Sequence, residues 1–196
     1  MDALNATAAE DAAAAASSGR RTPHERLTAL GLEPLGRAND FIDQIHHLMA
    51  RTPLFSGLTS DETRKLGEFM YVYESPPGVT LINEGEPGDF MLLLMHGIVD
   101  VLRRNRYNYP SRIAVAHVGH ALGEMSMFDG EPRFASCVTL ETCRIAVLTR
   151  DALMLVLSDE PALGNKILFK LVQLLSDRLR QTSAKLVSYL EAAREA

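Results

Sequence analysis

The hydrophobic pattern of this chain changes its period twice. In residues 38–51, apolar side chains recur every three or four positions, which is the spacing of one helix face. From residue 69 onward they come in short runs separated by turn residues, and after Pro161 the helical period returns and continues to about Glu191. This order predicts a helical segment, then a β-rich region, then one long helix.

The β-rich region contains seven candidate strands. They cover residues 69–73, 79–82, 90–95, 98–102, 113–118, 134–140 and 143–148. Turn residues such as Gly78, Pro87 and Gly97 lie between them. Short strands with frequent turns are typical of an antiparallel sandwich or barrel. We therefore expect an α+β fold, an antiparallel β-barrel or jelly roll with flanking helices.

Helix boundaries are marked by capping residues. Pro53 should end the first helix, and the run Thr59-Ser60-Asp61-Glu62 has the form of a capping box that opens a second one. Thr149 can cap a helix through Leu157, and Pro161 suits the first turn of the long helix.

The long helix carries a narrow apolar stripe. Its members alternate in steps of three and four: Val172, Leu175, Leu179, Thr182, Leu186 and Tyr189. A heptad stripe of this kind is the pattern of two helices packed side by side. We expect residues 159–196 to form a C-terminal dimerisation helix of a parallel homodimer.

Composition narrows the class of protein. The chain has 196 residues, 46% hydrophobic and 23% charged, with a formal net charge of −5. An acidic chain is a poor match for direct DNA binding, which needs a basic face. No apolar stretch is long enough for a membrane span and no secretory signal is visible, so we expect a cytoplasmic protein. Residues 1–37, which include the alanine run 12–16, are predicted to be a flexible tail.

Metal and disulfide chemistry are not favoured. Cys137 and Cys143 have no metal-ligand spacing and are interpreted as small buried residues on adjacent strands. His117 and His120 are three positions apart, and in a strand such positions point to opposite faces, so the pair would chelate a metal poorly. The arginine-rich loop 103–112 is interpreted as a solvated hairpin tip rather than an RNA-binding patch.

The segment 123–136 carries the most specific chemistry. It opens with Gly123 and Glu124 and closes with Arg133 ahead of small residues. A glycine lets the backbone approach a ligand, and free N–H groups at a helix start attract anions. The planar fork of Arg133 can bind two oxygens of one phosphate, and Glu124 can accept hydrogen bonds from sugar hydroxyls. Taken alone, the segment could also be a surface turn with an ordinary ion pair.

The same segment resembles the phosphate-binding cassette of the cyclic-nucleotide-binding domain family, which includes the catabolite activator. The matching residues are Gly123, Glu124, Met125, Pro132, Arg133, Ala135 and Ser136. Phe134 and Ser126 depart from the pattern, since a smaller residue is usual at the first position and alanine at the second. Residues 53–58, 85–89 and 96–101 also resemble family segments, so the resemblance covers roughly residues 38–192. It implies a cyclic-nucleotide-binding β-barrel domain with N-terminal helices over residues 38–158.

The resemblance also implies roles for individual residues. Glu124 matches the acceptor of the ribose 2′-hydroxyl and Arg133 the partner of the phosphate. Gly123 and Ala135 match positions where the backbone approaches the ligand, and Ser136 matches a hydroxyl that in some relatives helps to read the base. Ligand-binding candidates are therefore Gly123, Glu124, Met125, Ser126, Arg133, Phe134, Ala135 and Ser136. Thr182 and Ser183 resemble the pair that meets the adenine from both subunits of the dimer; alternatively, Thr182 is a polar position that fixes the register of the dimer.

These features predict a non-enzymatic receptor for a cyclic nucleotide, with cyclic AMP as the ligand and cyclic GMP or cyclic di-GMP as alternatives. No metal, cofactor or catalytic group is expected. The chain stops at Ala196 without a DNA-reading module, so we expect the signal to pass to an unidentified protein partner. The alternative is a degenerate domain that serves as an interaction scaffold or binds another nucleotide, since Phe134 could crowd the pocket.

Overall fold

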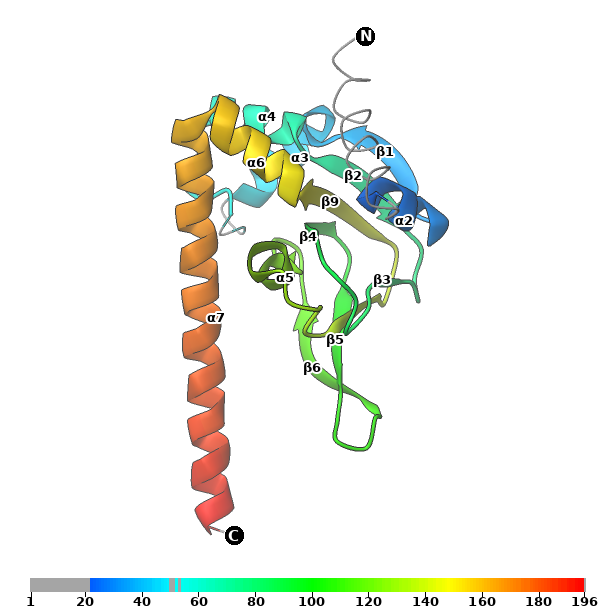
Figure 1. Ribbon diagram of the computed structural model, residues 1–196, viewed down its shortest axis with the longest axis vertical. Helices are drawn as coiled ribbons and strands as arrows, with labels where there is room; N and C mark the ends of the chain where they lie inside the picture. Colours follow the sequence, from blue (N-terminus) through cyan, green and yellow to red (C-terminus); the bar gives the residue numbers. More distant parts are fainter. Residues whose placement is uncertain (1–21, 50–51, 53, 196) are drawn as a thin grey trace.

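Two antiparallel sheets form the centre of the molecule, with helices at one end and a long helix along one side (Figure 1). The structure, a computed structural model, describes residues 22–49, 52 and 54–195. One sheet has the strand order β1-β2-β9-β4-β7 and the other the order β3-β8-β5-β6. The sheets form a jelly-roll-like arrangement that does not close into a barrel, so the predicted fold class is confirmed in this open form.

The bounds of the elements are as follows. The five-stranded sheet contains β1 (Glu33–Arg37), β2 (Tyr71–Ser75), β9 (Cys143–Thr149), β4 (Phe90–His96) and β7 (Ala121–Leu122). The four-stranded sheet contains β3 (Thr80–Ile82), β8 (Ser136–Thr139), β5 (Val99–Arg104) and β6 (Pro110–Ala116). The helical elements are α2 (Pro23–Ala29), the 3₁₀ turn η1 (Ala38–Phe41), α3 (Ile42–Met49), α4 (Ser60–Glu68), α5 (Glu124–Asp129), α6 (Arg150–Asp159) and α7 (Pro161–Glu195).

Strand β4 separates two apolar clusters because both of its faces are buried. Met91, Leu93 and Met95 belong to a cluster that includes residues of α4, α6 and α7. Phe90, Leu92 and Leu94 belong to a second cluster between the two sheets. Side chains of a strand alternate between its faces, so a strand buried on both sides must be apolar at every position. This accounts for the uninterrupted sequence Phe-Met-Leu-Leu-Leu-Met of β4.

The N-terminal part is more ordered than the sequence predicted. Residues 22–37 were expected to belong to a flexible tail, but they form α2 and β1. Thr22 closes a capping box with Glu25, and Leu27 and Leu32 are buried in the cluster between the sheets. The prediction was wrong for these residues because α2 buries few apolar side chains, too few to show a periodic pattern. Residues 1–21, with the alanine run, lie outside the described residues.

The predicted helix boundaries are largely confirmed. Thr59 caps α4 in a capping box with Glu62, and Thr149 caps α6 by accepting a hydrogen bond from the N–H of Ala152. Pro161 is the first residue of α7. The helix expected from residue 38 begins instead with the turn η1 and continues as α3; Pro53, its expected end, lies outside the described residues.

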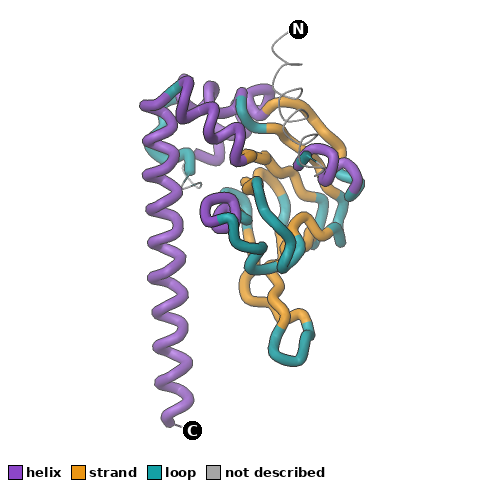
Figure 2. The backbone as a smooth tube through the Cα atoms, viewed as in Figure 1, coloured by secondary structure: helices purple, strands orange, loops and turns teal. Residues whose placement is uncertain are grey.

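Helix α7 packs on the domain only through its first half. Its buried hydrophobic side chains are Leu163, Ile167, Leu171 and Leu174. Beyond these the helix extends past the sheets (Figure 2), and Leu179, Leu186 and Tyr189 are exposed. Among the described residues, no helix is both long enough and apolar enough to cross a membrane.

Candidate functional site

Helix α5 forms one wall of the candidate site, and the glycine at its N-terminus makes the turn into this helix possible. Gly123, at the N-terminal cap of α5, has φ = 80°, in the left-handed region that side chains disfavour. A Cβ atom at this position would also collide with the guanidinium of Arg133. The glycine therefore permits both the turn into α5 and the close approach of Arg133 to the backbone.

Arg133 is buried and has backbone partners. Its side chain comes from the segment between α5 and β8, and the residue is only 4% exposed. Nη1 donates to the carbonyl oxygen of Gly123 (2.6 Å) and Nη2 to that of Phe90 (2.8 Å). Burial lowers the pKa of Arg133, and the negative charge of Asp89 opposes this effect. A guanidinium has five N–H donors, so donors remain after the two carbonyl groups are bound.

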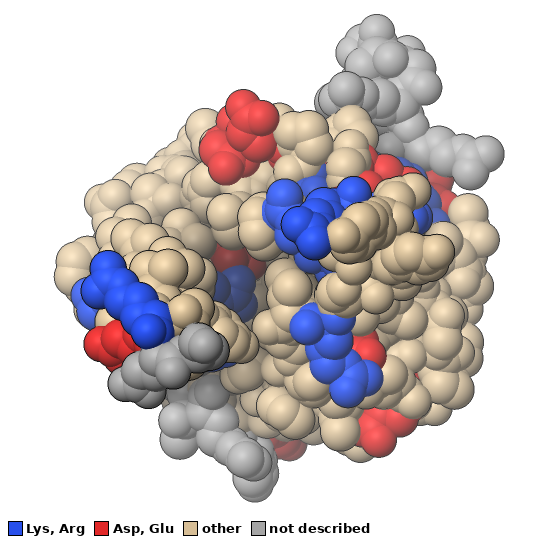
Figure 3. Space-filling view, turned by 90° about the horizontal axis from the view of Figure 1, so that it is seen from below, with Lys and Arg blue, Asp and Glu red and all other residues tan. Residues whose placement is uncertain are grey.

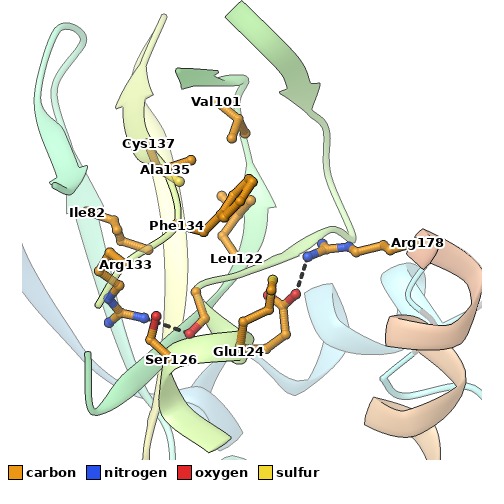
Figure 4. A pocket seen from close by; sticks show the side chains of 12 residues that line it. Ile82, Val101, Leu122, Glu124, Ser126, Arg133, Phe134, Ala135, Cys137 and Arg178 are labelled. Atoms are coloured by element: carbon orange, nitrogen blue, oxygen red, sulfur yellow. Dashed lines mark hydrogen bonds and ion pairs between the residues drawn. The ribbon is translucent and has the colours of Figure 1, made fainter. Parts of the chain in front are cut away.

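Glu124 is also buried, but it is paired with a cation from another element. The residue is 1% exposed, and its Oε1 accepts a hydrogen bond from Nη1 of Arg178 on α7 (Figure 4). Arg178 also donates to the carbonyl oxygen of Ala121. The other carboxylate oxygen, Oε2, is buried and has no hydrogen-bond partner in the described part of the chain. One side chain of α7 therefore joins this helix to α5 and β7.

A cavity of about 90 Å³ lies between these residues. Seen from below, the molecule has a hollow with basic and acidic side chains at its bottom (Figure 3). Seven predicted site residues line the cavity: Gly123, Glu124, Met125, Ser126, Arg133, Phe134 and Ala135. The other residues that line it, which no sequence motif indicated, are Ile82, Val101, Leu122, Cys137 and Arg178. In the close-up, Arg133 and Arg178 lie on opposite sides, with Phe134 and Leu122 between them (Figure 4).

Three predicted residues do not line this cavity. Ser136 accepts a hydrogen bond from the N–H of Glu84 (2.9 Å), which uses its hydroxyl to hold the neighbouring loop. Thr182 and Ser183 are exposed on α7, about one turn beyond Arg178. Within this single chain, Arg178 is therefore the residue of α7 that reaches the site.

Phe134 was the residue expected to crowd the pocket. It is 52% exposed, and the guanidinium of Arg103 lies over its ring, 3.7 Å from the centroid. Arg103 also donates to the carbonyl oxygen of Phe134 (3.2 Å). The ring therefore lines the cavity while half of its surface stays open to solvent.

The two cysteines are buried, as predicted, and both are free thiols. They lie on β8 and β9, which follow one another in the sequence but belong to different sheets, so the prediction of adjacent strands was wrong. Burial raises the pKa of Cys137, which lines the cavity, to about 12. Burial also raises the pKa of Cys143.

A family model, a solved structure and curated proteins all relate this chain to cyclic nucleotide-binding proteins. The family model of the cyclic nucleotide-binding domain matches residues 74–160. A crystal structure of a cyclic nucleotide-binding domain from Methylobacillus flagellatus is 38% identical with a TM-score of 0.73, over 80% of this chain and 88% of that one. A CRP-like cAMP-activated global transcriptional regulator of Mycobacterium tuberculosis is 29% identical over 143 residues, which are 73% of this chain.

The curated relatives are longer proteins. The matched part spans 62% of the Mycobacterium regulator and 24% of a cAMP-dependent protein kinase regulatory subunit of Aspergillus niger, which is 33% identical over 103 residues. The match to the Methylobacillus domain, in contrast, covers most of both chains. Fold, cassette residues and these similarities agree, and the chain belongs to the cyclic nucleotide-binding domain family.

Proposed function

We propose that the protein is a non-enzymatic receptor for a cyclic nucleotide, with cyclic AMP as its ligand, and that it signals through a protein partner. The observation that carries the proposal is the environment of Arg133. This cation is buried beside a cavity, and in the described part of the chain none of the ion pairs includes it. A buried cation without a paired anion is costly, and an anionic ligand would offset that cost.

A cyclic phosphate suits the donors that Arg133 has left. Two of its N–H groups are bound to the carbonyl oxygens of Gly123 and Phe90, which hold the guanidinium in place. The remaining donors can bind phosphate oxygens without breaking these bonds. Binding to a guanidinium that is already held costs little conformational entropy.

The ribose would be bound at Glu124. The buried Oε2 of this carboxylate lacks a hydrogen-bond partner among the described residues, and a ribose hydroxyl is a donor of the right kind. Glu124 and Arg133 thus offer an acceptor for a sugar and donors for a phosphate in one cavity. Cyclic AMP is the preferred candidate because several relatives, including the Mycobacterium regulator, are named as cAMP-activated or cAMP-dependent proteins.

Calorimetric titration tests the proposal. We expect the unaltered protein to bind cyclic AMP, and Arg133→Ala to lose roughly 3–5 kcal/mol of binding free energy, by analogy with broken buried ion pairs. The matched control is Arg144→Gln, which removes a guanidinium from an ion pair with Glu74 outside the cavity and should bind as the unaltered protein does.

Three outcomes separate the alternatives. Absence of heat with cyclic AMP and cyclic GMP at millimolar concentration would refute the receptor proposal. Heat with cyclic di-GMP alone would favour the degenerate domain that binds another nucleotide. A fall in cyclic AMP concentration during long incubation with the protein would contradict its non-enzymatic character.

A further inference from the structure

An ion pair joins the N-terminal helix to the loop behind Arg133. Arg26 of α2 binds the carboxylate of Asp89, which directly precedes β4. The two side chains are 31% and 50% exposed, so this contact lies at the edge of the core. Helix α2 lies outside residues 74–160, which the family model matches, so this contact joins the N-terminal part of the chain to the matched region.

The loop that carries Asp89 is bound to Arg133 at several points. The N–H of Gly85 donates to the carbonyl oxygen of Arg133 (2.9 Å), and the N–H of Arg133 donates to that of Glu86 (2.8 Å). A Cβ atom on Gly88 would overlap with the Arg133 guanidinium. The backbone of this loop is therefore fixed against both ends of Arg133.

The ring of Phe90 contacts both arginines. The Cζ atom of Arg26 is 5.1 Å from the ring centroid, and that of Arg133 is 4.5 Å from it. Two guanidinium groups and one nearby carboxylate, Asp89, thus occupy one small region. The charge of Asp89 favours the charged form of Arg133, and the charge of Arg26 opposes it.

Asp89 is therefore a potential competitor of the ligand. A carboxylate and a phosphate both bind the guanidinium fork, so a carboxylate released beside Arg133 would occupy donors that the ligand needs. In the structure, Asp89 is bound to Arg26 instead. Asp89 is thus neutralised by Arg26, and the free donors of Arg133 remain available for the phosphate of a ligand.

We propose that Arg26 is a positioning residue for the ligand site, because it holds Asp89 away from Arg133 and leaves the Arg133 donors to an anionic phosphate. This inference rests on the proposed function. It gives helix α2 a specific role: the N-terminal part sets the affinity of the site without contacting the ligand.

A double-mutant cycle with calorimetric titration of cyclic AMP tests the inference. We expect Arg26→Gln to weaken binding roughly three- to tenfold, a modest effect because the ion pair is partly exposed. We expect Asp89→Asn to bind at least as tightly as the unaltered protein. The double variant Arg26→Gln/Asp89→Asn should recover the unaltered affinity within about twofold, since the competing carboxylate is gone.

The rescue distinguishes this role from a merely structural one. If Arg26 only docks α2, or attracts the ligand by its charge, the double variant should stay as weak as Arg26→Gln, which would overturn the inference. Unchanged binding by Arg26→Gln, or a clear loss with Asp89→Asn, would overturn it as well. Asp89→Asn leaves the Arg26 side chain and its contact with the Phe90 ring in place, so this arm is informative even if Arg26→Gln fails to fold. No binding by the unaltered protein would instead refute the proposed function.

Discussion

Arg133 and Glu124, which both line the cavity, are stabilised in different ways. Arg133 is held by carbonyl oxygens and keeps free donors, whereas Glu124 is paired with Arg178 and keeps one unbound oxygen. Either charge alone would be costly to bury. A ligand with a phosphate and a neighbouring hydroxyl could bind the donors of Arg133 and the free oxygen of Glu124 at once. Two such contacts select a ligand more strictly than either one does alone.

The buried thiol of Cys137 should be unreactive in the folded protein. Burial raises its pKa from 9.0 to about 12, so the thiol stays protonated in the folded protein at pH 8. Since the thiolate is the reactive form, we expect iodoacetamide to leave Cys137 unmodified in the native protein and to modify it in guanidinium chloride. Mass spectrometry of tryptic peptides measures the difference.

The raised pKa of Cys137 also makes the stability of the folded protein depend on pH. A folded-state pKa above the unfolded one gives a contribution to stability that is complete below pH 9 and is lost as the pH rises toward about 12. We therefore expect the melting temperature of the unaltered protein to fall relative to that of Cys137→Ala as the pH rises above 9. Alkylation of native Cys137 at the rate of the denatured chain would contradict its burial.

Helix α7 is joined to the cavity through Arg178, which pairs with Glu124. Arg178→Gln would leave a buried carboxylate without its cation, and we expect a loss of about 1–3 kcal/mol of unfolding free energy. Hydrogen exchange should become faster in α5 and in the part of α7 around residue 178. Arg180→Gln is the matched control, since among the described residues Arg180 pairs only with the exposed Asp177 on its own helix.

We expect ligand binding to change helix α7 as well. If ligand contacts favour one arrangement of α5 and α7, binding shifts the population toward it. We expect cyclic AMP to slow hydrogen exchange in residues 123–136 and also in residues 182–189. Slowing confined to residues 123–136 would show binding without a change in α7.

The elements also show what a sequence can and cannot reveal. The seven predicted strands all exist because each has an apolar run or alternation of its own, whereas β1 contains Pro34 and Gly36, which are disfavoured in strands, and β7 has only two residues. In the site, Glu124 and Arg133 belong to one local motif. Arg178 lies 54 positions from Glu124 in the sequence, so only the folded chain brings it to the cavity.

At the scale of the whole molecule, the second half of α7 has no partner within the described chain. Leu179, Leu186 and Tyr189 are exposed, with 69% of Leu179 open to solvent. Leu174 and the buried residues before it already cover the domain, so this stripe is not needed for the core. Exposed apolar residues with heptad spacing favour a second helix as their partner, and we propose that this partner is α7 of a second copy.

Charge substitution in the stripe tests the dimer. Leu179→Glu/Leu186→Glu would place like charges on facing helices, and we expect this variant to be a monomer while the unaltered protein is a dimer by light scattering at micromolar concentration. The control Gln181→Glu/Ser188→Glu adds the same charge with the same spacing on the other side of the helix and should remain dimeric. If the unaltered protein is monomeric, Thr182 and Ser183 cannot contact a ligand across subunits, and binding must rest on the cavity of one chain.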